Sequence, residues 1–243
     1  MTTMRDVECL VLQCTEYKEN DALVTVCDED SIFTVYAKGV QKQTSKNRKL
    51  IQPFSKVMMT LSYRNSKSMP MLIHGNVITY YYKIQQDLLS QSICFVLIEA
   101  TKKSKGNKRI YHALDACFQA FQNNMNPITY ACLCMKEILC FEGVGMHVTS
   151  CVSCQRKDKL ETISIRDGGF LCHSCNAGRF TTYAKEELIQ YYSLFALKDA
   201  DEERFLNTME FTVDQFLFLS KWYEEHVHTQ LIGIQFLNAI KTL

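Results

Sequence analysis

Apolar and polar residues alternate along the first third of the chain, from Val7 to about Lys83. Successive side chains of a β-strand point to opposite faces, so this period of two predicts strands. The residue types enriched in strands, Val, Ile, Thr, Tyr and Phe, dominate the same segments. Five strands are predicted, over residues 7–14, 22–29, 31–40, 54–63 and 71–83.

No helical pattern long enough for a βαβ unit separates these strands, so we expect them to pair antiparallel. A small closed barrel would bury one face of each strand, and an OB-fold is the five-stranded barrel that we predict. An SH3-like barrel is the alternative that the pattern leaves open. The polar run at residues 41–49 is interpreted as a loop of this barrel.

The hydrophobic period changes to that of a helix after Asp87. Apolar residues three and four positions apart form one stripe over residues 89–100 and a second over residues 110–121. A third helix is predicted to begin at Asn126-Pro127, an N-cap followed by proline at the first helical position, and to end near Gly143. Stripes of this kind bury their apolar faces against one another, which predicts a bundle.

Helices are expected to resume near Thr182, with acidic residues in the first turn. Thr212 and Gln215 match a capping box, and Phe211 and Phe216 occupy the flanking positions of a hydrophobic staple. The last part of the chain is therefore predicted to rejoin the bundle.

Two Cys-x-x-Cys pairs lie between these helical regions, Cys151 with Cys154 and Cys172 with Cys175, separated by seventeen residues. Each pair places two thiolates on one turn, and two pairs complete a tetrahedral four-sulfur shell that suits zinc. The spacing is typical of zinc sites, whereas a redox-active pair and incidental cysteines are the alternatives. Four sulfur ligands leave no position for an activated water, so we predict a structural Zn²⁺ ion.

A segment of about thirty residues cannot stabilise itself by burial alone, and metal binding supplies the missing free energy. His147 and His173 are nearby alternative ligands that a full cysteine set leaves unneeded. The segment carries both signs of charge, as Arg156, Lys157, Lys159, Arg166 and Arg179 against Asp158, Glu161 and Asp167. Whether it contacts nucleic acid, contacts protein or is purely structural stays open.

The predicted fold class is α+β: a five-stranded OB-fold barrel followed by a helical bundle with an inserted four-cysteine zinc module. The barrel is assigned to residues 1–83 and the bundle to residues 84–243, with the insert at about 144–181.

Composition agrees with a globular chain, since 47% of the 243 residues are hydrophobic, 22% are charged, and there are only nine Gly and three Pro. Charged residues interrupt the first thirty positions, so no secretory signal is expected, and no apolar run is long enough for a membrane span. Twelve cysteines, most of them in apolar patterns, fit a reducing compartment. We expect a cytoplasmic protein.

The net charge of +1 conceals a marked asymmetry. Residues 1–30 hold two basic and eight acidic side chains, residues 31–110 hold fourteen and two, and residues 111–243 hold eleven and sixteen. No acidic residue occurs between Asp30 and Asp87. Stretches with one sign of charge usually face a polyanion.

These cations repel one another, and a nucleic-acid backbone would relieve that repulsion and release counterions. The predicted DNA-binding residues are Lys38, Lys42, Lys46, Arg48, Lys49, Lys56, Arg64 and Lys67. Aromatic residues near them are possible stacking platforms for bases, namely Phe33, Tyr36, Tyr63 and Tyr81. The alternative interpretation is a solvated, lysine-rich loop, with each aromatic residue in the core.

Enzyme signatures are absent from the sequence, which contains no P-loop, no zinc-protease helix, no nucleophile elbow and no dinucleotide-binding glycine motif. His226 and His228 are two residues apart and do not share a helix face, so they are not interpreted as a metal pair. We predict no enzymatic activity.

Several short motifs, taken together and in order, resemble the bacterial RecO family of DNA repair and recombination mediators. They are Glu19 with Asp21, the turn Ala37-Lys38-Gly39, the tripeptide Gln52-Pro53-Phe54, the segments GVGMHVTSCVSC and GGFLCHSC, and IGIQFL near the end. The resemblance covers nearly the whole chain. The sequence departs from the family pattern at His147, where members often have Pro, at Gln155, where they often have Gly, and at the GIQFL segment, where a more basic end is common.

The resemblance implies an OB-fold, a helical bundle and a zinc module. It also implies binding to single- and double-stranded DNA, annealing of complementary strands, and association with RecR in the RecFOR pathway. The family's task is to help place RecA on DNA coated by single-stranded-DNA-binding protein, at the nucleoid during repair. A zinc-containing protein-interaction scaffold is the alternative function, and a metal-dependent nuclease is a third that would need a carboxylate cluster.

Overall fold

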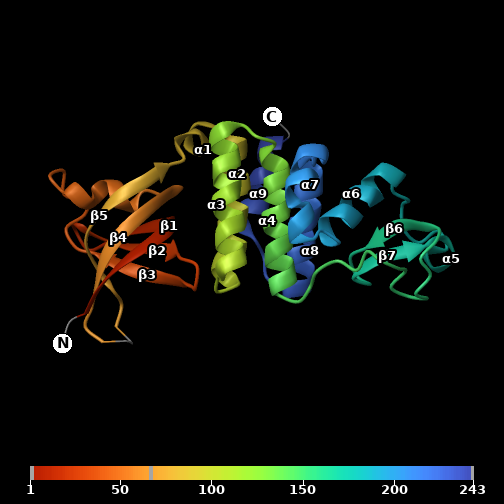
Figure 1. Cartoon of the computed structure of the whole chain (residues 1–243), viewed down its shortest axis with the longest axis horizontal. Coiled ribbons are helices and arrows are strands. Elements are labelled where there is room, and N and C mark those ends of the chain that lie inside the picture. The colour runs from red at the N-terminus through yellow and green to blue at the C-terminus, as the bar shows by residue number, and fades with distance from the viewer. Residues whose placement is uncertain (1–2, 66–67, 242–243) are drawn as a thin grey trace.

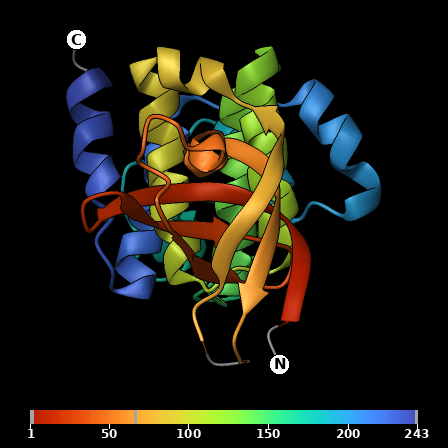
Figure 2. The ribbon, with the colours of Figure 1, turned by 90° about the vertical axis from the view of Figure 1, so that its left-hand side faces the viewer.

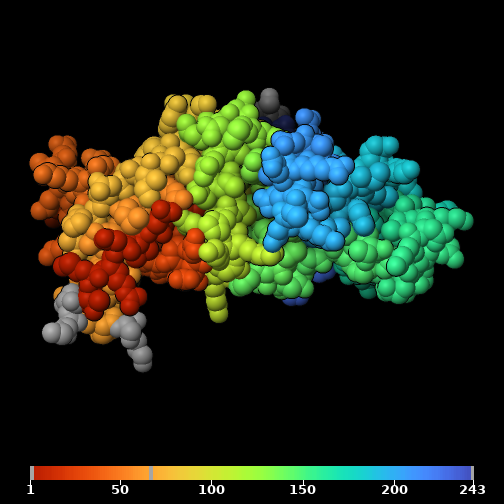
Figure 3. Space-filling view, in the orientation of Figure 1, coloured from red at the N-terminus to blue at the C-terminus, as the bar shows by residue number. Residues whose placement is uncertain are grey.

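The computed structural model describes residues 3–65 and 68–241. Three bodies follow one another along its longest axis: a β-barrel, a helical bundle and a small cysteine-containing module (Figure 1). The space-filling view shows that they form one continuous elongated molecule, with the barrel and the module at opposite ends (Figure 3).

The barrel is closed, with strand order β1-β2-β3-β5-β4. Its strands are β1 (Thr3–Tyr17), β2 (Asp21–Cys27), β3 (Ile32–Ala37), β4 (Ser55–Tyr63) and β5 (Met71–Tyr80). All neighbouring pairs are antiparallel except β3 with β5, which meet in parallel at Tyr36 and Met71. The predicted five-stranded OB-fold is consistent with this topology. β1 is longer than predicted because it pairs with both β2 and β4.

Alternation along β1 explains how the barrel joins the rest of the molecule. Cys9 and Val11 point into the barrel core, whereas Leu10 and Leu12 belong to a second apolar cluster shared with the helices. Seen from the barrel end, the strands stand directly in front of the bundle (Figure 2). One strand therefore supplies both the barrel core and the contact with its neighbour.

The connection between β3 and β4 was predicted to be a loop, but it is partly helical. It contains a short 3-10 helix, η1 (Lys46–Ile51), whose Leu50 and Ile51 are buried in the barrel core. The side-chain amide of Asn47 donates to the carbonyl of Ile73 at 2.9 Å and holds this helix against β5. The cations of the run, Lys42, Lys46, Arg48 and Lys49, are exposed, while the apolar residues that follow it are buried in the barrel core.

The bundle begins with the short helix α1 (Tyr82–Gln86) and continues with α2 (Leu88–Lys103), α3 (Lys108–Asn123) and α4 (Pro127–Phe141), which confirms the three predicted helices. Asn126 precedes α4 but does not cap it with its side chain, contrary to the prediction. Its backbone is left-handed (φ 47°), and its amide donates instead to the carbonyl of Met209 at 2.8 Å.

The chain returns to the bundle through α6 (Lys185–Phe195), α7 (Glu202–Thr208), α8 (Val213–Val227) and α9 (Ile232–Lys241), with a 3-10 turn, η2 (Asp199–Asp201), before α7. The predicted capping box is confirmed, because Thr212 and Gln215 exchange side-chain and backbone hydrogen bonds at the start of α8. Trp222 of α8 is fully buried and donates to the carbonyl of Val144 at 2.9 Å. No helix in the described part of the chain is long and apolar enough to cross a membrane.

Candidate metal centre and nucleic-acid interface

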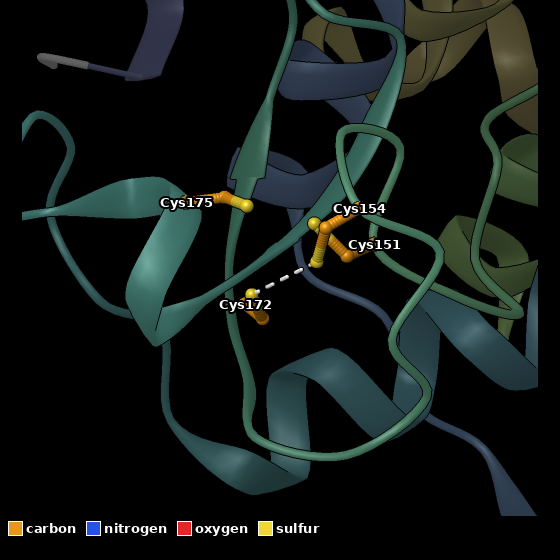
Figure 4. Close-up of side chains that lie close together, drawn as sticks. All are labelled: Cys151, Cys154, Cys172 and Cys175. Atoms are coloured by element: carbon orange, nitrogen blue, oxygen red, sulfur yellow. Dashed lines mark hydrogen bonds between the residues drawn. The ribbon is translucent and has the colours of Figure 1, made fainter.

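The four cysteines of the two Cys-x-x-Cys pairs converge in the module at the far end from the barrel (Figure 4). Their sulfur atoms all lie within 4.8 Å of one another, and those of Cys154 and Cys172 are 3.6 Å apart. Cys151 and Cys172 are buried, and Cys154 is exposed. Such a cluster of four thiols has the donor set and the spacing of a metal site.

The first pair lies on a tight turn. The amide of Cys151 donates to the carbonyl of Arg156 at 2.8 Å, and the amide of Gln155 donates to the carbonyl of Cys151 at 2.9 Å. Gln155 adopts a left-handed conformation (φ 62°), which favours glycine. This explains physically why glycine suits the position.

The second pair is delivered by a hairpin, β6 (Leu160–Ser164) and β7 (Gly169–Cys172), and by the one-turn helix α5 (His173–Asn176). Gly168 has a positive φ of 82°, as the turn requires. Gly169 lies so close to the chain before the first pair that an added Cβ would stand 2.2 Å from the carbonyl oxygen of His147. The double glycine therefore brings the two cysteine pairs together.

The pKa values of two of the cysteines show that their thiolates oppose one another. Burial opposes ionisation of Cys151, but backbone N–H groups of Cys154, Cys172 and Ser153 outweigh it and lower the pKa to about 6. The backbone N–H of Arg156 acts in the same direction on Cys154, yet its thiol neighbours Cys175 and Cys172 raise its pKa to about 11. One thiolate forms readily and then opposes the next, a conflict that a bound cation removes.

The two histidines considered as alternative ligands have other partners. Nε2 of His147 lies 2.8 Å from the hydroxyl of Ser150, and Nδ1 of His173 lies 2.8 Å from a carboxylate oxygen of Glu161. Neither belongs to the group of residues within metal-ligand distance.

The predicted cations that the structure describes lie in the barrel, at the end of the molecule away from the metal centre. Six of them are exposed and make no ion pair within the described residues, namely Lys38, Lys42, Lys46, Arg48, Lys49 and Arg64. The first five lie in the connection between β3 and β4, at the outer end of the barrel (Figure 1), and Arg64 follows β4. We call these six residues the basic surface. Lys67 lies outside the described residues.

Lys56 differs from the other cations, and its interpretation as an unpaired charge is wrong. Its ammonium group lies 2.8 Å from Glu8 and 3.0 Å from Asp115 of α3. Burial opposes its charge, but the hydrogen bonds that its ammonium group donates to these two carboxylates hold the pKa of Lys56 well above its usual value. Lys56 joins the barrel to the bundle, so its charge is already compensated.

Most of the aromatic residues near the cations belong to the core. Tyr81 is 1% exposed and donates to Asp115 at 2.5 Å, so it cannot act as a stacking platform. Phe33 and Tyr63 are half-buried against the barrel core and border a depression that also contains Asp28. Tyr36 is different, because it faces a groove with cations at its edge.

This groove encloses about 630 Å³ and is formed by Tyr17, Lys18, Leu23, Tyr36, Ser62, Arg64, Ser68, Met69 and Met71. The rings of Tyr17 and Tyr36 meet edge to face with centroids 6.2 Å apart, and the ammonium group of Lys18 lies 5.3 Å from the Tyr17 centroid. The groove lies on β2 and β3 between the β1–β2 and β4–β5 loops, the face with which OB-folds bind oligonucleotides. Tyr17 and Lys18 were missed in the sequence, although the predicted fold already placed the β1–β2 loop at this face.

The described residues thus form an OB-fold barrel with an exposed basic surface, joined to a helical bundle that carries a four-cysteine cluster. Comparison with protein families identifies the family. Residues 1–81 match the family model "Recombination protein O N terminal", and residues 88–231 match "Recombination protein O C terminal". The chain therefore belongs to the RecO family, which supports a role in DNA repair and recombination.

Individual relatives agree. The chain is 27% identical over 187 residues to the DNA repair protein RecO of Syntrophomonas wolfei, covering 74% of each chain. It is 22% identical over 243 residues to the DNA repair protein RecO of Bacillus subtilis, covering 97% of this chain and 94% of the relative.

Proposed function

We propose that this protein is a non-enzymatic mediator of DNA repair and recombination, which binds single- and double-stranded DNA and anneals complementary strands. With RecR, it would assist the loading of RecA on DNA coated by single-stranded-DNA-binding protein. The observation that carries the proposal is the basic surface: six exposed cations on an OB-fold barrel, with no ion-pair partner among the described residues.

Charge compensation explains how this surface would bind DNA. Each lysine or arginine that contacts a phosphate releases condensed counterions, which gives affinity that depends on salt and little on sequence. Because the cations lie on the surface of the barrel, in the connection between β3 and β4 and directly after β4, they can contact a backbone without rearrangement of the core. Neutralising the phosphates of two strands also lowers their mutual repulsion, so complementary bases can pair without nucleotide hydrolysis.

The groove adds a means of preferring unpaired bases. Tyr17 is 43% exposed beside Tyr36, and aromatic faces stack on bases of any sequence. A duplex keeps its bases stacked inside and presents only its backbone to such a site. The groove is therefore proposed to contribute to single-strand binding, and the basic surface to both forms.

The ion is proposed to be zinc, bound by Cys151, Cys154, Cys172 and Cys175, because four clustered thiols favour zinc over hard cations. With all four coordination positions taken by sulfur, the ion would hold the module in shape and take no part in a reaction. The assignment of residues 1–83 to the barrel domain, residues 84–243 to the bundle domain and about 144–181 to the insert stays a prediction, as do the cytoplasmic location and the association with the nucleoid.

The salt dependence of oligonucleotide binding tests the proposal. We expect the variant with Lys38, Lys42, Arg48 and Lys49 all changed to Ala to bind a fluorescent single strand more weakly. The slope of log affinity against log salt should become shallower by up to about 3, since each phosphate contact contributes about 0.7.

A matched control removes the same charge from the opposite end of the molecule. The exposed residues Arg156, Lys157, Lys159 and Arg166 of the module are changed to Ala. This control should keep the slope of the parent protein. Equal slopes in the parent and the barrel variant would refute the assignment of DNA binding to the basic surface.

A further inference from the structure

A carboxylate lies beneath the surface proposed to bind DNA. Asp21, the first residue of β2, is 9% exposed and lies near the ammonium groups of Lys18 and Lys38. Electrostatics alone makes an acidic residue unfavourable here, because it repels phosphate. Its contacts show what it does instead.

Both oxygens of Asp21 accept hydrogen bonds from groups that build the proposed DNA site. Oδ2 accepts from the hydroxyl of Tyr36, the ring that lines the groove. Oδ1 accepts from the backbone N–H of Gly39 at 2.7 Å. Gly39 has a left-handed φ of 62° and directly follows Lys38, so this bond fixes the turn from which the lysine projects.

The surroundings of Asp21 connect the two loops beside the groove. Tyr36 meets Tyr17 edge to face, so holding the Tyr36 hydroxyl also holds the wall against which Tyr17 rests. The backbone N–H of Gln41 donates to the carbonyl of Asn20 at 2.9 Å, which ties the turn after β3 to the β1–β2 loop. The hydrogen bonds from Tyr36 and Gly39 lower the pKa of Asp21, so it remains an ionised acceptor at neutral pH.

We propose that Asp21 is a positioning residue for nucleic-acid binding: it holds the Tyr36 ring and the Ala37–Gly39 turn in the arrangement that a single strand contacts. This inference rests on the proposed function, since it assigns a role within the same surface. Asp21 itself makes no contact with DNA in this arrangement, and its own charge opposes binding.

An electrostatic role and a positioning role of Asp21 predict opposite changes in DNA affinity when the carboxylate is removed. Asp21→Ala removes a negative charge, so a purely electrostatic role predicts tighter DNA binding. A positioning role predicts weaker binding of a single-stranded oligonucleotide, by about fivefold or more, the effect of a lost stacking contact. Asp21→Asn keeps the shape, accepts from Gly39 and can donate to the Tyr36 oxygen, so it should bind at least as tightly as the parent.

Two further variants separate positioning from folding. Tyr36→Phe removes only the hydroxyl from a half-buried ring, and it should lower single-strand affinity more than duplex affinity, whereas general loss of structure lowers both. It also tests the inference if Asp21→Ala does not fold. Asp28→Ala is the matched control, because Asp28 accepts from the backbone N–H groups of Asp30 and Ser31 at the other end of β2. It should not weaken binding.

Affinities are measured by fluorescence anisotropy with a single-stranded oligonucleotide and its duplex. If Asp21→Ala binds the single strand as tightly as the parent or more tightly, or if Tyr36→Phe leaves the ratio of the two affinities unchanged, Asp21 is not a positioning residue. In that case the proposed function still stands, provided that the variant lacking Lys38, Lys42, Arg48 and Lys49 loses affinity. A parent protein that binds neither oligonucleotide would overturn both.

Discussion

The barrel and the cysteine module, at the two ends of this molecule, differ in how many apolar residues each buries in a core of its own. Fourteen of the described apolar residues of the barrel, from Cys9 to Leu72, are buried in its own core. The buried core of the module consists of Cys151, Leu171 and Cys172, two of which belong to the cysteine cluster. Apolar burial stabilises the barrel. The module has little core of its own and packs Ile163 and Phe170 into the apolar cluster of the bundle, so the proposed zinc ion would supply much of its stability.

This difference bears on where function can lie. A barrel held by its own core is free to vary the residues between its strands, and the cations of the basic surface make no ion pair there with any described residue. The module uses its turns and glycines to bring four thiols together, and its exposed charges have both signs. The comparison therefore supports the proposals that the barrel binds DNA and that a bound metal ion stabilises the module.

Among the substitutions that we predict, removal of one cysteine ligand should have the largest effect, and it should affect the module and not the barrel. We expect Cys172→Ser to abolish zinc binding and the protection of the module from hydrogen exchange, since metal binding supplies about 10–16 kcal/mol in small zinc domains. The barrel should keep its protection and its oligonucleotide affinity. Zinc content and exchange are measured together. Cys140→Ser, an exposed cysteine outside the cluster, is the control and should retain the metal.

A substitution where the barrel joins the bundle should lower the free energy of unfolding more than one elsewhere on the barrel surface. Asp115 is buried and accepts from Lys56 at 3.0 Å and from Tyr81 at 2.5 Å, while Tyr111 donates to Glu8 at 3.1 Å in the same network. Asp115→Ala removes two charge-assisted hydrogen bonds, so we expect the free energy of unfolding to fall by about 3 kcal/mol. Chemical denaturation measures this change.

An exposed carboxylate of the barrel provides the control for that experiment. Asp6 accepts from the hydroxyl of Thr60 at 2.5 Å, and Asp6→Asn should change the free energy of unfolding by no more than about 0.5 kcal/mol. If both substitutions have the same small effect, the network around Lys56 does not hold the barrel to the bundle.

The smallest effect is expected at the turn of the first cysteine pair. Gln155 has a left-handed backbone, so Gln155→Gly should relieve strain and stabilise the metal-bound module by less than about 1 kcal/mol. Gln155→Ala keeps the strain and loses the contact in which the hydroxyl of Ser150 donates to the side chain at 3.0 Å, so it should destabilise the module. Thermal unfolding of the parent and both variants gives the order of their stabilities. If Gln155→Ala is more stable than Gln155→Gly, backbone strain at Gln155 does not explain why glycine suits the position.

Local patterns predicted the strands, the main helices and the cysteine pairs, because each depends on residues close in sequence. The two partners of Lys56 could not be predicted in this way, since Glu8 meets it through the pairing of β1 with β4, and Asp115, 59 residues further along the chain, only after the barrel packs on α3. The groove is a similar case, because Tyr17 meets Tyr36 only when β1, β2 and β3 pair. The sequence could not show whether Tyr81 is exposed for stacking or buried in the core, because its burial depends on tertiary packing.

Hydrogen exchange of the whole metal-bound protein, with and without a single-stranded oligonucleotide at low salt, tests the division between the two ends most directly. We predict new protection at residues 17–23, the β1–β2 loop and the strand ends that flank it, and in the connection after β3, residues 38–51, with none in residues 151–180. Protection confined to residues 151–180, with an unchanged barrel, would contradict it.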